Sequence, residues 1–341
     1  MAADIAEQPA VYERLLDERS AVAEAAREIA RRVPRRVLLA ARGTSDHAAL
    51  YGAYLFEIRL GISAGLVSPS AITIYGARPD LRDCLVIAIS QSGGSPDIAE
   101  VVRVARDQGA TTLAVTNAPE SALAGAAELS IDIAAGPERA VAATKTYTAQ
   151  LLTLALLVEG VRTGTGALGA EEEQALRALP ALAGTTLADD AAVELAERYR
   201  FAGQIVTTGR GYAYPTAREA ALKLMETSYL AALSFSGADL LHGPVAMADA
   251  DVPVLAVVGA GPAGESMRDV LATVAQRRAD LVVVGPVEVP GALHVRSPEV
   301  DERHAPLLDI LPLQRLALAL SLARGENPDS PRALTKVTAT L

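Results

Sequence analysis

A stretch rich in hydroxyl groups follows one of the predicted strands, and its composition suits the binding of an anion. It reads Ser-Gln-Ser-Gly-Gly-Ser over positions 90–95 and precedes Pro96 and a helical pattern. Glycines let the backbone approach a ligand closely, and hydroxyl and N–H groups at a helix start donate to phosphate oxygens. An ordinary turn that caps the next helix is the alternative. We interpret the stretch as a phosphate site with the ligands Ser90, Gln91, Ser92 and Ser95.

A second group of reactive side chains lies in the second half of the chain. Glu219, Lys223 and Glu226 are spaced by four and three residues, which places them on one face of a predicted helix. Such ladders are usually solvated, but the neighbouring residues here are apolar, so this helix should be mostly buried. A buried carboxylate beside a buried ammonium is a candidate acid/base pair. His242, just before a Gly-Pro pair, is a further proton-transfer candidate, although a lone histidine is more often structural.

Lysine occurs at only three positions, although the chain has 31 basic residues. The three are Lys145, Lys223 and Lys336. A codon bias toward arginine could leave them by chance. The functional interpretation is that each position requires a compact ammonium or an amine nucleophile, which a guanidinium does not replace.

The elements that must position these residues occur twice along the chain. The stretches 37–57 and 205–226 both read as an apolar run, a turn of small residues and a helical pattern. Two further apolar runs, Val86–Ile89 and Leu113–Thr116, recur 168 positions later as Val254–Val257 and Leu281–Val284. A constant offset over several elements predicts an internal duplication.

Each half alternates short apolar runs with helical stretches, which is typical of a doubly wound parallel sheet. We predict an α/β fold of two tandem flavodoxin-like domains, each a parallel sheet flanked by helices. The predicted boundaries are a helical arm over 1–30, a phosphate-binding domain over 31–165, connecting helices over 166–194, a second domain over 195–327 and a tail over 328–341. The second-half counterpart of the serine stretch, residues 258–262, has no hydroxyl group, so we expect phosphate to bind only in the first half.

The composition excludes several classes of protein. Half of the 341 residues are hydrophobic and 21% are charged, which is typical of a globular chain with a large core. The net charge of −10 argues against a nucleic-acid surface, and the apolar run Leu151–Val158 is too short to span a membrane. The chain has no nucleotide-binding fingerprint and no metal-ligand cluster, so we expect no cofactor and no metal. Cys84 has no partner for an internal disulfide, and the N-terminus is not a secretory signal, so we expect a cytoplasmic protein.

Taken together, the motifs resemble those of the tandem sugar isomerase (SIS) domain family. The motifs run nearly from end to end of the chain and read IAEQP, ARGTSDHA, ISQSGGSPD, AGPERAVAATK, GRGYAYPTAREAALKLMETSY, LLHGP and RALTKVT. They are similar to the isomerase half of glutamine–fructose-6-phosphate aminotransferases and, above all, to stand-alone glucosamine-6-phosphate deaminases. The difference between these two lies in single positions, such as Gly94 and Asp239, where the aminotransferases carry glutamate.

The resemblance implies roles for the candidate residues. The serine stretch, with Thr44 and Ser45 at the neighbouring turn, would hold the phosphate of a sugar phosphate. Glu226 would move a proton between C1 and C2, and His242 would help to open the sugar ring from the other subunit of a homodimer. Lys336 would lie by the sugar carbonyl, and Lys223 is the helix lysine of the motif. The turn that would line the sugar carries Val141, Ala143, Thr144 and Lys145.

The reaction implied by the resemblance is aldose–ketose isomerisation coupled to amine release. The leading hypothesis is conversion of glucosamine 6-phosphate and water to fructose 6-phosphate and ammonia. The alternatives are a fructosamine-6-phosphate deglycase, an aminotransferase subunit that uses ammonia, phosphoglucose isomerase and a sugar-phosphate sensor. Residue 2 is alanine and the only cysteine starts a predicted buried strand, so we expect that this chain does not hydrolyse glutamine.

Overall fold

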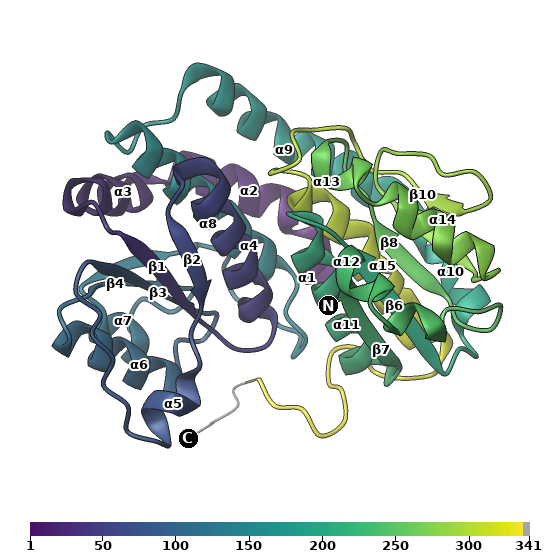
Figure 1. Ribbon diagram of the computed structural model, residues 1–341, viewed down its shortest axis with the longest axis horizontal. Helices are drawn as coiled ribbons and strands as arrows, with labels where there is room; N and C mark the ends of the chain where they lie inside the picture. Colours follow the sequence, from purple (N-terminus) through teal and green to yellow (C-terminus); the bar gives the residue numbers. More distant parts are fainter. Residues whose placement is uncertain (337–341) are drawn as a thin grey trace. The chain divides into compact units, whose positions relative to one another are not determined.

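The computed structural model describes residues 1–336, which form two compact units. The N-unit consists of Ala10–Glu138, Lys145–Ala178 and the described residues 335–336. The C-unit consists of Met1–Pro9, Arg139–Thr144 and Leu179–Leu334. Each unit contains one five-stranded sheet (Figure 1).

The N-unit sheet is parallel throughout, with the strand order β2-β1-β3-β4-β5. Its strands are β1 (Arg36–Ala40), β2 (Ser63–Leu66), β3 (Cys84–Ser90), β4 (Thr111–Thr116) and β5 (Leu129–Asp132). Every residue of the central strand β3 is buried. Such continuous burial is expected where helices cover both faces of a parallel sheet.

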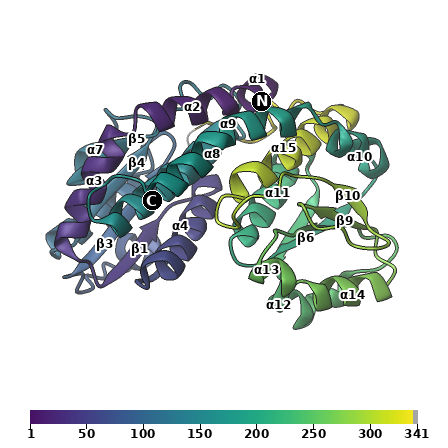
Figure 2. The ribbon, with the colours of Figure 1, turned by 90° about the horizontal axis from the view of Figure 1, so that it is seen from above.

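Helices on both faces complete three layers in the N-unit (Figures 1 and 2). On one face, α4 (Thr44–Leu60) packs on β1 and β3 and against α8 (Lys145–Thr163), which in turn contacts α3 (Ser20–Arg32). On the other face, α6 (Pro96–Asp107) packs on β3 and β4, flanked by α5 (Pro69–Thr73) and α7 (Ala122–Ala126). The loops that follow β1 and β3 therefore lead directly into α4 and α6.

The C-unit repeats this topology, which is consistent with the predicted duplication. Its strands are β6 (Gln204–Gly209), β7 (Ala231–Ser236), β8 (Val254–Val257), β9 (Leu281–Val284) and β10 (Leu293–Val295), in the parallel order β10-β9-β8-β6-β7. β3 and β8, which contain the apolar runs related by the offset of 168, are each the central strand of their sheet. The predicted α/β fold class is therefore confirmed.

Helices also cover the C-unit sheet. One group comprises α10 (Ala191–Tyr199), α11 (Ala213–Ser228) and α15 (Pro306–Ala323). α10 and α11 each pack against α15, and α11 also packs on β6, β7 and β8. The other comprises α12 (Gly237–Leu241), α13 (Pro262–Glu265) and α14 (Arg268–Gln276). α15 is the one described helix long and apolar enough to cross a membrane, but most of it is buried against its neighbours. Such burial is typical of a core helix.

The remaining helices precede the first sheet along the chain or connect the two sheets. The N-terminal arm contains α1 (Ala2–Ala6), α2 (Gln8–Asp17) and α3, and α9 (Ala170–Ala188) leads the chain toward α10.

The two halves differ in the connection after the fourth strand of each sheet. In the N-unit this connection, residues 117–128, contains α7. In the C-unit the corresponding connection, residues 285–292, contains no helix and is shorter. The α7 side chain Leu123 belongs to the N-unit core on α6, so the C-unit has no helix to fill the equivalent place.

Asp309, in the first turn of α15, is a buried carboxyl that accepts a hydrogen bond from the hydroxyl of Ser297. Burial raises the pKa of Asp309 to about 7, and the bond from Ser297 offsets this only in part. The folded protein therefore keeps a proton on Asp309 at pH values where the unfolded chain has lost it.

We expect the free energy of unfolding to fall as the pH rises from about 4 to about 7, since the folded state binds the extra proton. Asp309→Asn keeps the acceptor oxygen for Ser297 and removes this titration. At about pH 8 the variant should therefore unfold roughly 2–8 °C above wild type, with little difference near pH 4. Differential scanning calorimetry at both pH values tests this, and an equal shift at both would contradict it.

Candidate functional site

The serine loop, residues 90–95, lies at the carboxyl end of β3 and leads into α6. The Ser90 hydroxyl accepts a hydrogen bond from the N–H of Gly93 at 3.1 Å, and the Ser92 hydroxyl accepts one from Gly94 at 3.2 Å. A hydroxyl that accepts such a bond still has its own proton to donate. These contacts hold the loop in a shape whose hydroxyl groups can donate to an anion.

Gly93 is the position that fixes the course of this loop. Its φ of +60° is one that L side chains rarely adopt, and an added Cβ would lie 2.0 Å from the Ser121 hydroxyl oxygen. Its carbonyl accepts a hydrogen bond from the N–H of Leu123 in α7. The glycine is therefore required because α7 packs directly on the loop.

Thr44 and Ser45 lie beside the serine loop at the same edge of the sheet. They begin α4 after β1, and β1 pairs with β3 up to the register Ala40–Ala88. The Ser45 hydroxyl accepts a hydrogen bond at 3.0 Å from the buried amide of Gln150, on α8. The predicted phosphate ligands Thr44, Ser45 and the serine loop are thus brought together at the carboxyl ends of neighbouring strands, where ligands bind in open α/β sheets.

Arg42 is a residue at this edge that the sequence analysis missed. It precedes Gly43 and Thr44 and forms an ion pair at 2.8 Å with Asp97, in the first turn of α6. Asp97 is buried, whereas about half of the Arg42 side chain is exposed. The sequence did contain a signal for it, because Arg42 directly precedes a Gly-Thr-Ser turn at the end of a predicted strand. Asp97 positions this guanidinium between the starts of α4 and α6.

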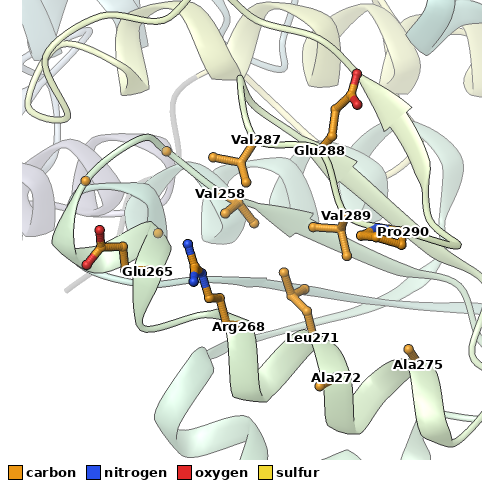
Figure 3. A pocket seen from close by; sticks show the side chains of 13 residues that line it. Val258, Glu265, Arg268, Leu271, Ala272, Ala275, Val287, Glu288, Val289 and Pro290 are labelled. Atoms are coloured by element: carbon orange, nitrogen blue, oxygen red, sulfur yellow. The ribbon is translucent and has the colours of Figure 1, made fainter.

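In the C-unit the chain's own carboxyl takes the place of an anion. The loop at 258–262 follows β8, and the N–H groups of Ala263 and Gly264 donate to Oε1 of Glu302 at 3.1 and 3.3 Å. Burial raises the pKa of Glu302, and the two N–H groups counter this in part. An added Cβ at Gly261 would meet the Glu302 carboxyl at 3.1 Å. These contacts are a physical reason to expect no phosphate at this loop (Figure 3 shows its surroundings).

The predicted acid/base residues lie together on α11. Nζ of Lys223 pairs with the Glu226 carboxylate and lies 3.4 Å from Oε1 of Glu219. Burial by itself lowers the pKa of Lys223, but the two carboxylates outweigh it and raise that pKa above its usual value. Lys223 and Glu219 are buried, whereas 23% of the Glu226 side chain is exposed. Glu226 is therefore the member of the trio that a ligand can reach.

His242 and Lys336, the other two predicted catalytic residues, are not part of α11. His242 ends α12 as its C-cap residue, and its side chain is exposed on the C-unit. Lys336 is the last described residue, is half-buried and belongs to the N-unit by its contacts.

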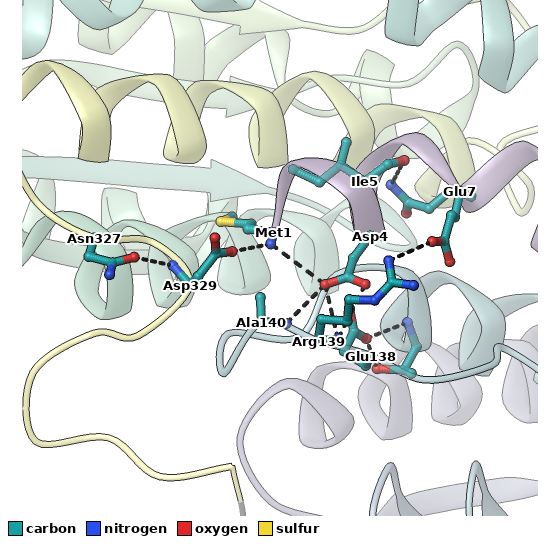
Figure 4. A network of polar contacts seen from close by, with 11 residues as sticks. Met1, Asp4, Ile5, Glu7, Glu138, Arg139, Ala140, Asn327 and Asp329 are labelled. Carbon is teal, nitrogen blue, oxygen red and sulfur yellow. Dashed lines mark hydrogen bonds and ion pairs between the residues drawn. The ribbon is translucent and has the colours of Figure 1, made fainter.

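The turn predicted to line the sugar is held by the N-terminal helices (Figure 4). The buried carboxylate of Asp4, in α1, accepts hydrogen bonds from the N–H groups of Arg139 and Ala140 at 3.0–3.3 Å. Farther along the turn, the Gln314 side chain donates to the Thr144 carbonyl at 3.3 Å and accepts from Gln8 at 2.9 Å. The sequence analysis quoted the IAEQP motif, which contains Gln8, without giving it a role.

Residues 141–145 run from this turn into α8. Val141 and Ala143 are half-buried, whereas Thr144 and Lys145 are fully buried. The N–H of Val141 donates to the carbonyl of Asp329 at 3.3 Å. All three lysines of the chain are thus at least partly buried, in contrast to most of its arginines.

Residues 1–336 offer little for a metal or a thiol mechanism. Within them, no group of three or more His, Cys, Asp or Glu side chains has the arrangement of a metal site. Cys84 is buried at the start of β3, and burial raises the pKa of its thiol. A buried, protonated thiol is a poor nucleophile.

Comparison with known proteins identifies the family. The SIS domain model matches residues 32–160 and 199–287, which is more than half of the chain. Over 346 aligned residues the chain is 36% identical to the glutamine–fructose-6-phosphate aminotransferase [isomerizing] of Thermococcus kodakarensis, covering 98% of this chain and 57% of that protein. The chain therefore spans somewhat more than half the length of this relative.

Two solved structures share the fold. The C-terminal domain of glucosamine-fructose-6-phosphate aminotransferase from Francisella tularensis superposes with a TM-score of 0.87 at 26% identity, covering 96% of this chain and 97% of that one. Glucosamine-6-phosphate deaminase from Thermotoga maritima superposes with a TM-score of 0.79 at 19% identity, covering 99% of each chain. At that identity the second likeness shows the fold alone.

Ser90→Ala combined with Ser92→Ala should remove two hydrogen bonds to a charged phosphate. Each such bond contributes about 1.5–3 kcal/mol, so affinity for a hexose 6-phosphate should fall roughly 100-fold or more. Isothermal titration calorimetry measures this, with thermal unfolding to check the fold. Ser266→Ala, next to the C-unit loop, is the matched control and should bind as wild type. Wild-type affinity in the double variant would show that the serine loop is not the phosphate site.

Proposed function

Because the chain belongs to the SIS domain family, we propose that it is a sugar-phosphate isomerase that also releases an amine. The proposed reaction converts glucosamine 6-phosphate and water into fructose 6-phosphate and ammonia. The observation that carries the proposal is the trio on α11, in which Glu226 alone is partly exposed while a buried Lys223 fixes its carboxylate. An accessible carboxylate of fixed orientation is what proton transfer between adjacent carbons requires.

The chemistry proceeds through the open-chain sugar. Ring opening moves a proton to the ring oxygen and exposes the C1 aldehyde. Glu226 takes the proton from C2 and returns it to C1, while one amine proton passes from nitrogen to O1, so that the aldehyde becomes a C1 alcohol and the C2 amine becomes a C2 imine. Water then adds to C2, and the C–N bond breaks with release of ammonia, leaving the ketone of fructose 6-phosphate.

The other residues bind and orient the substrate in this proposal. The serine loop, with Thr44 and Ser45, holds the phosphate, and the turn at 141–145 lines the sugar. Lys336 lies by the sugar carbonyl. Lys223 is a positioning residue, because its ammonium is buried between two carboxylates.

We assign His242 to ring opening, in the active site of a second subunit. Its imidazole is exposed at the end of α12, which suits a residue that acts outside its own subunit. The functional assembly in this proposal is a homodimer.

The nitrogen chemistry distinguishes the proposal from its closest alternative. The relative from T. kodakarensis is named an aminotransferase, which favours the reverse reaction, in which ammonia and fructose 6-phosphate form the amino sugar. Glutamine should not be a donor for this chain, because its only thiol, Cys84, is buried and has a raised pKa.

Purified protein should release ammonia and fructose 6-phosphate from glucosamine 6-phosphate without glutamine. Glu226→Gln should lower kcat by about 10²–10⁴-fold, because general acid–base catalysis contributes that much. KM should change little, since the serine loop is intact. Glu219→Gln is the matched control: it removes the other carboxylate on Lys223, and kcat should fall far less. Steady-state assays of both products provide the measurement.

The outcomes separate the alternatives. Cleavage of a fructosamine 6-phosphate with no reaction of glucosamine 6-phosphate would replace the proposal by a deglycase. Formation of glucosamine 6-phosphate from ammonia without detectable hydrolysis would establish the synthase direction. Binding of these sugars without turnover would support a sensor.

If His242 acts in the partner's site, two inactive variants should complement each other. Glu226→Gln and His242→Ala proteins, mixed under conditions that allow subunit exchange, should recover activity on the order of a quarter of wild type, since half of the dimers are mixed and each has one intact site. The mixture should gain activity only as exchange proceeds. A fully active monomer in sedimentation velocity would rule out a shared site.

A further inference from the structure

The C-unit contains a cavity of about 580 Å³ on the side of the sheet that carries α14. Its walls come from the end of β8, from α14 and from the segment 287–290, which follows β9 (Figure 3). The volume is within the range of small-molecule sites, about 300–1,000 Å³.

The cavity corresponds to the place that α7 fills in the N-unit. There, α7 lies between β4 and β5, packs on α6 and inserts Leu123 into the core. The C-unit has no helix between β9 and β10, and in the shorter connection Val289 and Ala292 are only partly buried where they pack on the C-unit core, so α14 and the end of β8 border an open cavity. The C-unit framework therefore has room for an apolar group at this place.

The lining is mainly apolar, with one cation, Arg268, and two carboxylates, Glu265 and Glu288, at its edge. Val258, Leu271, Ala275, Val287 and Val289 form the apolar wall. Figure 3 shows the Arg268 guanidinium directed toward Val258, whereas the Glu265 carboxylate points away from this wall.

The charged side chains around the cavity differ in their partners, and Glu265, like Arg268, has none within residues 1–336. Glu288 pairs with Arg296, and Arg277 donates to the carbonyls of Ala246 and Ala248. Within residues 1–336, no ion pair or hydrogen bond engages the Arg268 side chain. A cation beside an apolar wall attracts a ligand that carries one negative charge on an apolar body.

We propose that this cavity binds a small organic monoanion, a carboxylate joined to an aromatic or branched aliphatic group. The carboxylate pairs with Arg268, and the apolar group lies against Leu271, Val287 and Val289. The site is separate from the proposed sugar-phosphate site and does not depend on it.

A sugar phosphate does not suit this cavity. The adjacent N–H groups of Ala263 and Gly264 are already bonded to Glu302, and the wall offers hydroxyl groups no hydrogen-bond partners among its valine, leucine and alanine side chains. The carboxylates of Glu265 and Glu302 would repel a phosphate dianion more strongly than a monoanion.

Indole-3-acetate is a suitable probe, with its neutral amide, indole-3-acetamide, as the uncharged match. The chain contains no tryptophan, so fluorescence anisotropy excited where tyrosine does not absorb reports on the probe alone. The acid should bind saturably with a Kd on the order of 0.1–1 mM. The amide should bind at least fivefold more weakly, and excess fructose 6-phosphate should displace neither probe.

Two exposed positions on α14 test the two parts of the site with little risk to folding. Arg268→Gln should weaken the acid to the affinity of the amide and leave the amide unchanged. Ala275→Phe, which fills the cavity, should weaken both probes tenfold or more. Gln276→Phe adds the same ring at an exposed neighbour that does not line the cavity, and Arg103→Gln removes an exposed arginine of α6; neither should alter binding.

Several results would overturn the proposal. Equal affinity for acid and amide would show that Arg268 does not select an anion, and so would a preference that survives Arg268→Gln. Unchanged binding in Ala275→Phe would place the probe elsewhere, and displacement by fructose 6-phosphate would place it in the sugar-phosphate site. If Ala275→Phe instead changed the sedimentation coefficient and not probe binding, the cavity would belong to a contact between copies of the chain.

Discussion

The buried ammonium of Lys223 is the charge on which the arrangement of the C-unit's acid/base residues depends. A charge removed from water is strongly unfavourable unless it is paired, and α11 supplies two carboxylates, one turn on either side, in Glu219 and Glu226. Glu219 is as buried as Lys223, so this buried ion pair holds the more exposed carboxylate of Glu226 in place. A glutamate whose orientation is set by a buried partner loses little conformational freedom when a ligand arrives, which favours proton transfer at a defined atom. An arginine at 223 would need space for a planar fork within a packed helix layer, which helps to explain a lysine in a chain that otherwise uses arginine.

Duplication produced two loops with the same position in the sheet and opposite electrostatic character. After β3, hydroxyl groups and an exposed guanidinium, Arg42, are available to an anion. After β8, the N–H groups donate inward to Glu302. A carboxyl supplied by the chain satisfies those N–H groups without a ligand, so the second loop is stable in the free protein. One loop is thus polar, whereas the other borders an apolar cavity edged by Arg268, whose side chain has no partner within residues 1–336.

The sequence predicted the fold and the buried strands β1, β3, β4, β6, β8 and β9 well, because buried parallel strands are short apolar runs and the constant offset related the two halves. It did not predict the strands β2, β5, β7 and β10, which are short or less apolar and lie toward the sheet edges. It also predicted that Glu219, Lys223 and Glu226 share a helix face, since that depends only on local spacing. It did not reveal Arg42–Asp97 or Glu302, because these contacts join residues 55 and nearly 40 positions apart and depend on how loops meet at a sheet edge. The cavity was equally hidden, because it arises from a helix that one half does not have, and no residue in the sequence marks such a place.

The turn at 139–144 shows why a motif far from a candidate site can still determine its geometry. A turn without regular hydrogen bonding must satisfy its backbone groups elsewhere. Here Asp4 accepts from two consecutive N–H groups, and Gln8 orients the Gln314 amide that bonds the Thr144 carbonyl. Both ends of the turn are therefore fixed by α1 and α2, ahead of the point where Lys145 begins α8. If this turn lines the sugar, the buried polar side chains of the N-terminal helices determine how accurately the turn is placed. Asp4 and Gln8 are then polar because they hold the turn, and not because they contact the substrate.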